Sequence, residues 1–139
     1  TAIGWAPDVG HIENGGMSAI EQMKAHRDLI RHVHFKDRIA QNEWAVMGEG
    51  KIDYPAIIKY LAETGYLGWV MVEDESPRAE TDSDGVVAED GKYMWRQSDR
   101  SRLCWKKRYF SKDTKKFFLR RKRDYEYAYS CGNGSRSPW

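Results

Sequence analysis

The segments IRHVHF (residues 30–35) and GWVMVE (residues 68–73) predict two β-strands, because each is short, largely apolar and bounded by polar or glycine-containing stretches. Side chains alternate between the two faces of a strand. His32 and His34 therefore share one face of the first strand, and Glu73 stands at the end of the second. The apolar residues on the opposite faces would be buried under helices, which indicates a layered α/β fold.

Two helical patterns accompany these strands. Ser18 is placed to begin a helix over about residues 19–30, immediately before the first strand. Asp53 is placed to cap a second helix that leads to the second strand, with Pro55 tolerated in its first turn and Gly65 at its end. Strands that alternate with helices of this length predict βαβ units and a parallel sheet, and such units normally continue into a barrel or a doubly wound sheet.

Two further segments complete the predicted α/β part. Residues 3–11 are apolar but interrupted by Pro7, so they predict the end of a strand that runs into a loop before Gly15-Gly16. The stretch after Phe35, which contains Gly48-Glu49-Gly50, predicts a polar loop that leads to the second helix.

The charge distribution divides the chain near residue 95. Residues 1–95 contain 9 Lys/Arg and 17 Asp/Glu, whereas residues 96–139 contain 14 Lys/Arg and 4 Asp/Glu. We therefore expect an α/β part over residues 1–95 and a basic, aromatic-rich tail over residues 96–139.

Several classes of protein are disfavoured by composition. No apolar run approaches the roughly 20 residues of a membrane-spanning helix, and no signal peptide is recognisable at the start of the sequence. Cys104 and Cys131 are the only cysteines, too few and too far apart for a disulfide framework or a zinc cluster. A cytoplasmic protein with free thiols and no membrane partner is expected.

The basic tail has three open interpretations. Basic residues are interleaved with aromatic ones in KKRYF (residues 106–110) and KKFFLRRKR (residues 115–123). Such segments can bind nucleic acid through phosphate contacts and base stacking, or bind an anionic membrane surface. The third interpretation is sequence that did not evolve with the α/β part, as a frameshift, a truncation or a fusion junction would produce. Tyr125, Tyr127 and Tyr129 alternate as in a strand, and loop or disorder is expected beyond residue 130.

Asp8, His34 and Glu73 each stand near the C-terminal end of their predicted strand. In a (β/α)8 barrel, active sites are built at that end, where the three side chains could meet at one cation. Taken singly, each residue is more often a hydrogen-bonded surface group. Spaced by regular βα units, the three together favour a site for a divalent metal such as Mn, Co, Mg or Zn.

Four motifs occur in a recognisable order: DVGH (residues 8–11), HVHFKD (32–37), GEGKID (48–53) and GYLGWVMVE (65–73). Together they resemble the last three βα units of the xylose isomerase-like TIM barrels, over about residues 3–94. That group includes sugar phosphate isomerases/epimerases, ketose 3-epimerases, inosose dehydratases and rhizopine-catabolism proteins. The stretch VEDESP (72–77) is most similar to the last two. The resemblance implies a partial (β/α)8 barrel followed by the basic tail.

The resemblance also implies a metal held by a Glu, an Asp, a His and a second Glu. Asp8 resembles the Asp ligand, His34 the His ligand and Glu73 the second Glu, which would also be the catalytic acid or base. The first Glu of the family lies on an earlier strand, for which this sequence shows no segment. The chain is therefore expected to be the C-terminal part of such an enzyme and not a complete catalyst by itself.

Three further residues are implied to lie near the substrate, a small sugar or cyclitol. His11 resembles the substrate-binding His of the Asp-x-x-His motif, and Arg38 corresponds to a substrate-contacting Arg. His32 is expected beside the site, where a substrate-binding role and a structural role are both open. A homo-oligomeric full-length protein is compatible with the resemblance.

The implied reaction is proton abstraction next to a carbonyl, as in an isomerase, an epimerase or a dehydratase. The competing hypothesis is a nucleic-acid-binding protein that uses the basic tail or kinship with endonuclease IV, a more distant member of the group. Such a nuclease needs several further His and Asp ligands, whereas this sequence has 4 histidines and no Asp-x-His pair after His34. Nucleic acid is therefore the less favoured partner.

Overall fold

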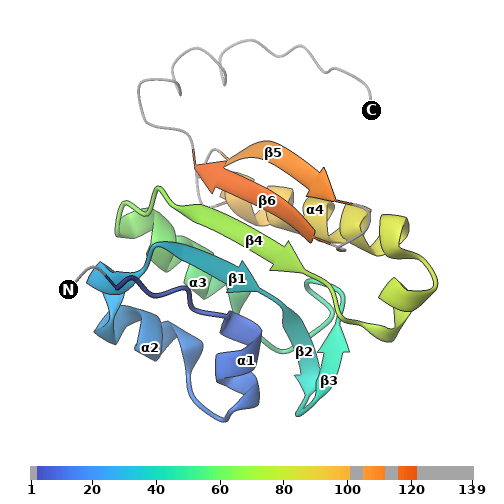
Figure 1. Ribbon diagram of the computed structural model, residues 1–139, viewed down its shortest axis with the longest axis horizontal. Coiled ribbons are helices and arrows are strands. Elements are labelled where there is room, and N and C mark those ends of the chain that lie inside the picture. Colours follow the sequence, from blue (N-terminus) through green and yellow to red (C-terminus); the bar gives the residue numbers. More distant parts are fainter. Residues whose placement is uncertain (1–2, 101–104, 112–115, 122–139) are drawn as a thin grey trace.

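Two parallel strands form the centre of the fold. The computed structural model describes residues 3–100, 105–111 and 116–121. Strand β1 (His32–Phe35) pairs with β4 (Trp69–Glu73) in parallel, from His32 opposite Trp69 to Phe35 opposite Val72. Both arrows point the same way in Figure 1, with helices behind the sheet. The two predicted strands and their parallel pairing are confirmed.

The residues before β1 extend this sheet by one short segment. Trp5 forms a parallel bridge with Ile30, and Asp8 forms one with His34. The predicted strand over residues 3–11 is thus only partly formed, and the prediction that a loop follows it is wrong. Helix α1 (Val9–Asn14) begins there instead, because the Asp8 side chain accepts a hydrogen bond from His11 N at 3.0 Å and caps the helix.

Helix α2 (Ala19–Ala25) begins after Ser18 as predicted, but it is shorter than the expected range. A 3-10 turn, η1 (Arg27–Leu29), follows it and leads into β1. The Arg27 side chain donates hydrogen bonds to Thr64 Oγ1 at 2.9 Å and to Thr64 O at 3.0 Å. This contact with the end of the next helix favours the turn over a continued α-helix at residues 26–30.

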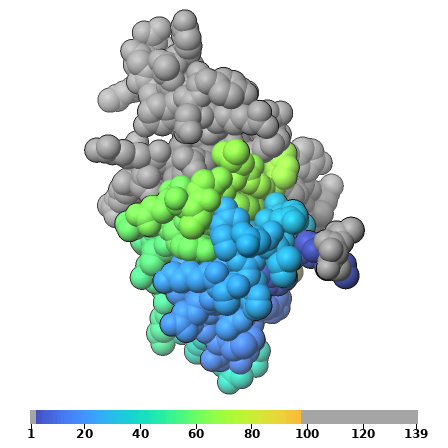
Figure 2. All heavy atoms as spheres, turned by 90° about the vertical axis from the view of Figure 1, so that its left-hand side faces the viewer, coloured from blue at the N-terminus to red at the C-terminus, as the bar shows by residue number. Residues whose placement is uncertain are grey.

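Helix α3 (Tyr54–Glu63) confirms the second predicted helix. Asp53 Oδ1 accepts a hydrogen bond from Ala56 N at 3.0 Å, as an N-terminal cap should. Gly65 follows the helix with a φ of 66°, the left-handed conformation that favours glycine at a helix end. Figure 2 views the molecule from the side where β1 and β4 begin, and the segments near α2 (blue) and after α3 (green) meet there on one continuous face.

A hairpin occupies part of the predicted polar loop. Strands β2 (Asp37–Ala40) and β3 (Glu43–Ala45) pair antiparallel through a two-residue turn. Asn42 has a φ of 60° in this turn. Its backbone N–H donates to Asn14 Oδ1 at 2.7 Å, and the Asn14 amide donates back to Asn42 Oδ1 at 2.9 Å. The hairpin is therefore held by α1, a contact that the local sequence does not reveal.

The chain after β4 forms a 3-10 turn η2 (Pro77–Glu80), helix α4 (Ser83–Arg100) and strands β5 (Trp105–Ser111) and β6 (Lys116–Arg121). Strand β6 pairs antiparallel with the free edge of β4, so the sheet order is β1-β4-β6-β5. The described residues form an open sheet and not a closed barrel. The charge boundary near residue 95 falls inside α4, and the alternating tyrosines at 125–129 lie outside the described residues.

The core lies between the parallel strands and the helices. Val33, Phe35, Val70 and Val72, which alternate with the polar faces of β1 and β4, are fully buried. They pack against apolar residues of α2, α3 and α4, which include Met23, Ile57, Ile58, Leu61, Val86 and Met94. None of the described helices has the length and apolar character that a membrane crossing requires.

Candidate metal centre

Asp8, His34 and Glu73 lie together at the ends of neighbouring parallel segments. Each offers one ligand atom, and these atoms lie within 4.8 Å of one another. The closest pair is His34 Nδ1 and Glu73 Oε1, at 2.9 Å. The pairing of the segments explains this arrangement. On one side of β1, Asp8 forms a bridge with His34, and on the other side β1 pairs with β4, which ends at Glu73. The side chains therefore meet at the expected edge, and their role as ligands stays a prediction.

The two carboxylate oxygens of Asp8 have different neighbours. Oδ1 caps α1 through His11 N at 3.0 Å. Oδ2 lies 3.8 Å from His11 Nε2 and 4.0 Å from Lys36 Nζ. Oδ1 therefore caps helix α1, and Oδ2 lies on the side of Lys36.

Lys36 supplies a buried positive charge in the middle of this cluster. Its side chain is only 2% exposed. The ammonium lies 2.7 Å from Glu75 Oε1 and 3.4 Å from Glu73 Oε2. Burial alone would lower the pKa of Lys36, but the hydrogen bond with Glu75 and the charges of Asp8, Glu75 and Glu73 together raise it above its ordinary value. Lys36 therefore stays charged among carboxylates.

The backbone of Lys36 is fixed by Tyr54, the first residue of α3. The buried Tyr54 hydroxyl accepts a hydrogen bond from Lys36 N at 2.9 Å and donates one to Lys36 O at 2.8 Å. The neighbouring Asp37 carboxylate organises the loop after β3. It accepts hydrogen bonds from the backbone N–H groups of Arg38, Gly48, Gly50 and Ile52. A side chain at Gly50 would collide with Asp37, so glycine is needed there.

His11 and Trp44 line the same edge. The Trp44 ring centroid lies 5.1 Å from the His11 ring and 5.0 Å from Lys36 Nζ. His11 Nε2 is 3.2 Å from Lys36 Nζ. The His11 side chain is 57% exposed, so it borders the cluster from the solvent side. The structure therefore places His11 where a substrate could reach it.

The other two predicted substrate contacts differ in position. The His32 ring lies 5.0 Å from the His34 ring, on the same face of β1. Burial and the neighbouring His34 lower the pKa of His32, which favours a neutral imidazole. Arg38 Nη2 donates to Glu13 O at 2.8 Å and so joins β2 to α1. Its Nε is buried and has no partner among the described residues. A substrate role for either residue stays a prediction.

The donor set of Asp8, His34 and Glu73 suits a divalent metal ion. Two carboxylates and one imidazole form a mixed oxygen and nitrogen site, which such ions accept. Ligand atoms at roughly 2.0–2.2 Å from one ion and at right angles to each other stand about 3 Å apart. The 2.9 Å between His34 Nδ1 and Glu73 Oε1 matches that spacing. The residues present therefore fit a metal ion, although nothing in the set selects one metal.

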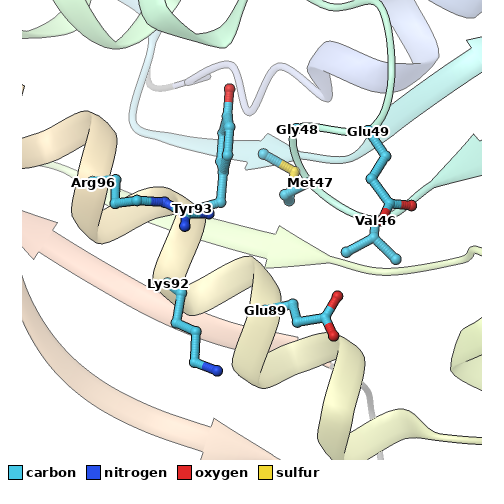
Figure 3. A pocket seen from close by; sticks show the side chains of 8 residues that line it. All are labelled: Val46, Met47, Gly48, Glu49, Glu89, Lys92, Tyr93 and Arg96. Carbon is cyan, nitrogen blue, oxygen red and sulfur yellow. The ribbon is translucent and has the colours of Figure 1, made fainter.

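A hollow lies between the loop after β3 and α4. Its volume is about 310 Å³. Figure 3 shows its lining of Val46, Met47, Gly48, Glu49, Glu89, Lys92, Tyr93 and Arg96. Arg78 contacts two of these lining residues. Its Nη2 lies 2.9 Å from Glu89 Oε1, and its Nη1 lies 3.6 Å from Glu49 Oε1. The lining contains none of the residues of the metal centre and mixes both signs of charge, so it indicates no particular ligand.

Sequence reasoning missed Lys36, Glu75 and Trp44 as members of the site. Lys36 follows the last residue of β1, where a lysine is usually solvated. One signal was available: Lys36 is two residues after His34, so strand alternation places the two on the same face. Glu75 offered the same signal relative to Glu73. Nothing local indicated Trp44, which reaches the cluster through the unpredicted hairpin.

Parts of the chain are similar to known proteins. A model of the xylose isomerase-like TIM barrel family matches residues 1–97. The inosose dehydratase of Clostridium botulinum (strain Eklund 17B / Type B) is 33% identical over 86 residues, which cover 49% of this chain and 29% of the relative. The inosose dehydratase of Lacticaseibacillus casei is 27% identical over 105 residues, with 63% and 35% covered. The rhizopine catabolism protein MocC of Rhizobium meliloti is 31% identical over 91 residues, with 52% and 28% covered.

The chain therefore spans only 28–35% of the length of these curated relatives. No solved structure matches it significantly.

Proposed function

This chain belongs to the xylose isomerase-like TIM barrel family, and we propose that it forms part of a divalent-metal-dependent enzyme that abstracts a proton next to the carbonyl of a sugar or cyclitol. The observation that carries the proposal is the meeting of Asp8, His34 and Glu73, whose ligand atoms lie within 4.8 Å of one another. An ion of Mn, Co, Mg or Zn would be held by these three side chains. When bound, it supplies positive charge that stabilises the oxyanion formed as the proton leaves.

Glu73 is the residue that would move the proton. Its carboxylate ends β4 and is 9% exposed, so it is shielded from water yet reaches the edge of the sheet. His34 Nδ1 lies 2.9 Å from one of its oxygens, and Lys36 Nζ lies 3.4 Å from the other. A carboxylate in this position can accept a proton from a carbon next to a carbonyl. Delivery of a proton to the opposite face by a second acid would be epimerisation, and loss of a neighbouring hydroxyl as water would be dehydration.

The substrate class is proposed from the relatives. Inosose dehydratases and a rhizopine catabolism protein are among the matches, at 27–33% identity. A cyclic polyol with a carbonyl group, of the inosose type, is therefore the first substrate to test, with a ketose as the second. His11, exposed at the edge of the cluster, would donate a hydrogen bond to a substrate oxygen.

Metal binding is the first test. Titration of the metal-free protein with Mn²⁺ in a calorimeter should show one site, and His34→Ala should weaken it by at least about tenfold because an imidazole ligand is lost. Glu63→Gln, which changes a surface carboxylate paired with Lys59, serves as the control and should bind like the wild type. Wild-type protein that takes up no divalent ion would overturn the proposal.

Proton abstraction is tested separately. A longer protein that adds the preceding βα units of the barrel to this chain is loaded with Mn²⁺ and incubated with an inosose or a ketose in D₂O, and deuterium incorporation next to the carbonyl is followed by NMR. Glu73→Gln should reduce the exchange rate by orders of magnitude, because an amide cannot accept the proton. Exchange that persists in Glu73→Gln would exclude Glu73 as the base.

A further inference from the structure

Three carboxylates surround the Lys36 ammonium. Asp8, Glu73 and Glu75 each place an oxygen within 4.0 Å of Nζ. Two of the three, Asp8 and Glu73, are candidate metal ligands. The carboxylates that attract Lys36 would therefore also attract a metal cation.

Lys36 lies beside one carboxylate oxygen of each of these two residues. Glu73 Oε1 is engaged by His34, whereas Oε2 lies 3.4 Å from Lys36 Nζ. Asp8 Oδ1 caps α1, whereas Oδ2 lies 4.0 Å from Lys36 Nζ. The ammonium therefore lies within 4.0 Å of both candidate carboxylate ligands.

We infer that Lys36 is the internal counter-cation of the metal centre: it neutralises the carboxylates while no ion is bound and limits how tightly the site holds a divalent ion. The inference rests on the proposed function, because it concerns the same site. Two like charges that share Asp8 and Glu73 repel each other, and they do so strongly where burial excludes water. Lys36 is therefore a residue that tunes metal affinity without being a ligand.

Glu75 gives the ammonium an alternative partner. It forms the shortest contact to Lys36 Nζ, at 2.7 Å, and its side chain is 49% exposed. The Lys36 backbone is anchored at both N and O by Tyr54. With the backbone fixed, the ammonium can approach Glu75 and move away from Asp8 and Glu73 when an ion enters. Glu75 should thus favour metal binding although it does not belong to the three-residue set.

The test compares Mn²⁺ binding by the wild type, Lys36→Met and Lys59→Met, with calorimetry and thermal unfolding as readouts. Methionine fills a similar volume without the charge. Lys59→Met is the matched control, because it removes the same charge from an exposed lysine of α3. Lys36→Met should bind Mn²⁺ at least about tenfold more tightly. It should also unfold at a lower temperature without the ion and gain more from its addition than the wild type.

Each outcome has a defined meaning. Tighter binding by Lys36→Met, with Lys59→Met unchanged, supports the inference even if the wild type itself binds no ion, a result that would overturn only the proposed function. Equal or weaker binding by Lys36→Met, with a wild type that does bind, overturns the inference and leaves the proposed function standing. Failure of all three proteins to bind overturns both.

A second variant covers the case in which Lys36→Met does not fold. Glu75 is half exposed, so Glu75→Gln should fold, and it removes the alternative partner of the ammonium. Mn²⁺ affinity should fall several-fold in Glu75→Gln, because Lys36 then stays with Asp8 and Glu73. Unchanged affinity in Glu75→Gln would contradict the inference.

Discussion

The Tyr54 hydroxyl forms two hydrogen bonds with a single residue: it accepts one from Lys36 N at 2.9 Å and donates one to Lys36 O at 2.8 Å. The ring is fully buried and packs against Phe35, with ring centroids 4.8 Å apart. Burial and the charge of Asp37 hold the pKa of Tyr54 well above its ordinary value, so the hydroxyl remains a donor. A side chain of α3 therefore fixes the backbone just after β1, from which the Lys36 side chain extends into the site.

Tyr54→Phe should destabilise the protein by about 1–3 kcal/mol, because it leaves a buried N–H and a buried carbonyl of Lys36 without partners. Urea unfolding followed by circular dichroism measures the change. Tyr60→Phe is the comparison, since its hydroxyl makes a longer bond, 3.3 Å, to Met23 O, and its effect should be smaller. Equal losses in the two variants would show that the Lys36 contacts contribute nothing special.

Gly10→Ala tests how closely α1 approaches the site. A Cβ at Gly10 would lie 2.5 Å from Lys36 O, closer than a carbon can approach, and 3.2 Å from the Trp44 ring, which is a tight contact. We expect a loss of roughly 1–3 kcal/mol, typical of overpacking. Gly91→Ala in α4 meets nothing within 4 Å and should instead stabilise the helix by up to about 1 kcal/mol. Thermal unfolding of the two alanine variants should therefore shift in opposite directions.

Much of the sheet could be predicted because its signals are local. Strand alternation separates His34 from Phe35, and the Asp53 cap marks the start of α3 within a few residues. The position of the site edge followed from parallel pairing alone, because the ends of parallel strands meet at one edge. These parts needed no knowledge of distant contacts.

The parts that were missed depend on non-local contacts. The turn at Asn42 lacks a glycine, and the hairpin is held by Asn14, which lies 28 residues earlier. Lys36 is buried because Asp8, Glu73 and Glu75 arrive from other segments of the chain. A lysine beside a strand end is solvated unless such partners appear, so sequence alone favoured the wrong environment for the residue that now occupies the centre of the site.

Asp37→Asn tests the loop that follows β3. The Asp37 carboxylate accepts four backbone N–H bonds at 2.9–3.4 Å and is 1% exposed. An asparagine amide would set its own N–H groups against two of those donors, so we expect a loss of about 2–3 kcal/mol in urea unfolding. Asp53→Asn is the matched control, because asparagine caps a helix about as well as aspartate. A loss of comparable size at Asp53 would argue that charge, and not the four-donor geometry, is what matters.

Asp90 and Asp74 form a buried pair that should make stability depend on pH. Asp90 Oδ1 accepts a hydrogen bond from Met47 N at 2.9 Å. The Oδ2 atoms of both aspartates are buried and have no hydrogen-bond partner among the described residues. A proton on Asp90 would allow it to donate a hydrogen bond to Asp74. Burial, reinforced by the negative charge of Asp74, accordingly raises the pKa of Asp90 to about 8.

The sign of the pH dependence follows from that raised pKa. An unfolded aspartate releases its proton near pH 3.9, so between about pH 4 and pH 8 the folded state binds a proton that the unfolded state has lost. The contribution of Asp90 to stability is therefore full below pH 4 and falls as the pH rises to 8. Asp90→Asn should remove this slope, because an amide can donate to Asp74 at every pH. Urea midpoints at pH 5 and pH 8.5 measure the slope. Asp84→Asn, which changes an exposed aspartate of α4, is the control and should show the same change in midpoint as the wild type. If Asp90→Asn also showed that same change, Asp90 would carry no proton in the folded protein.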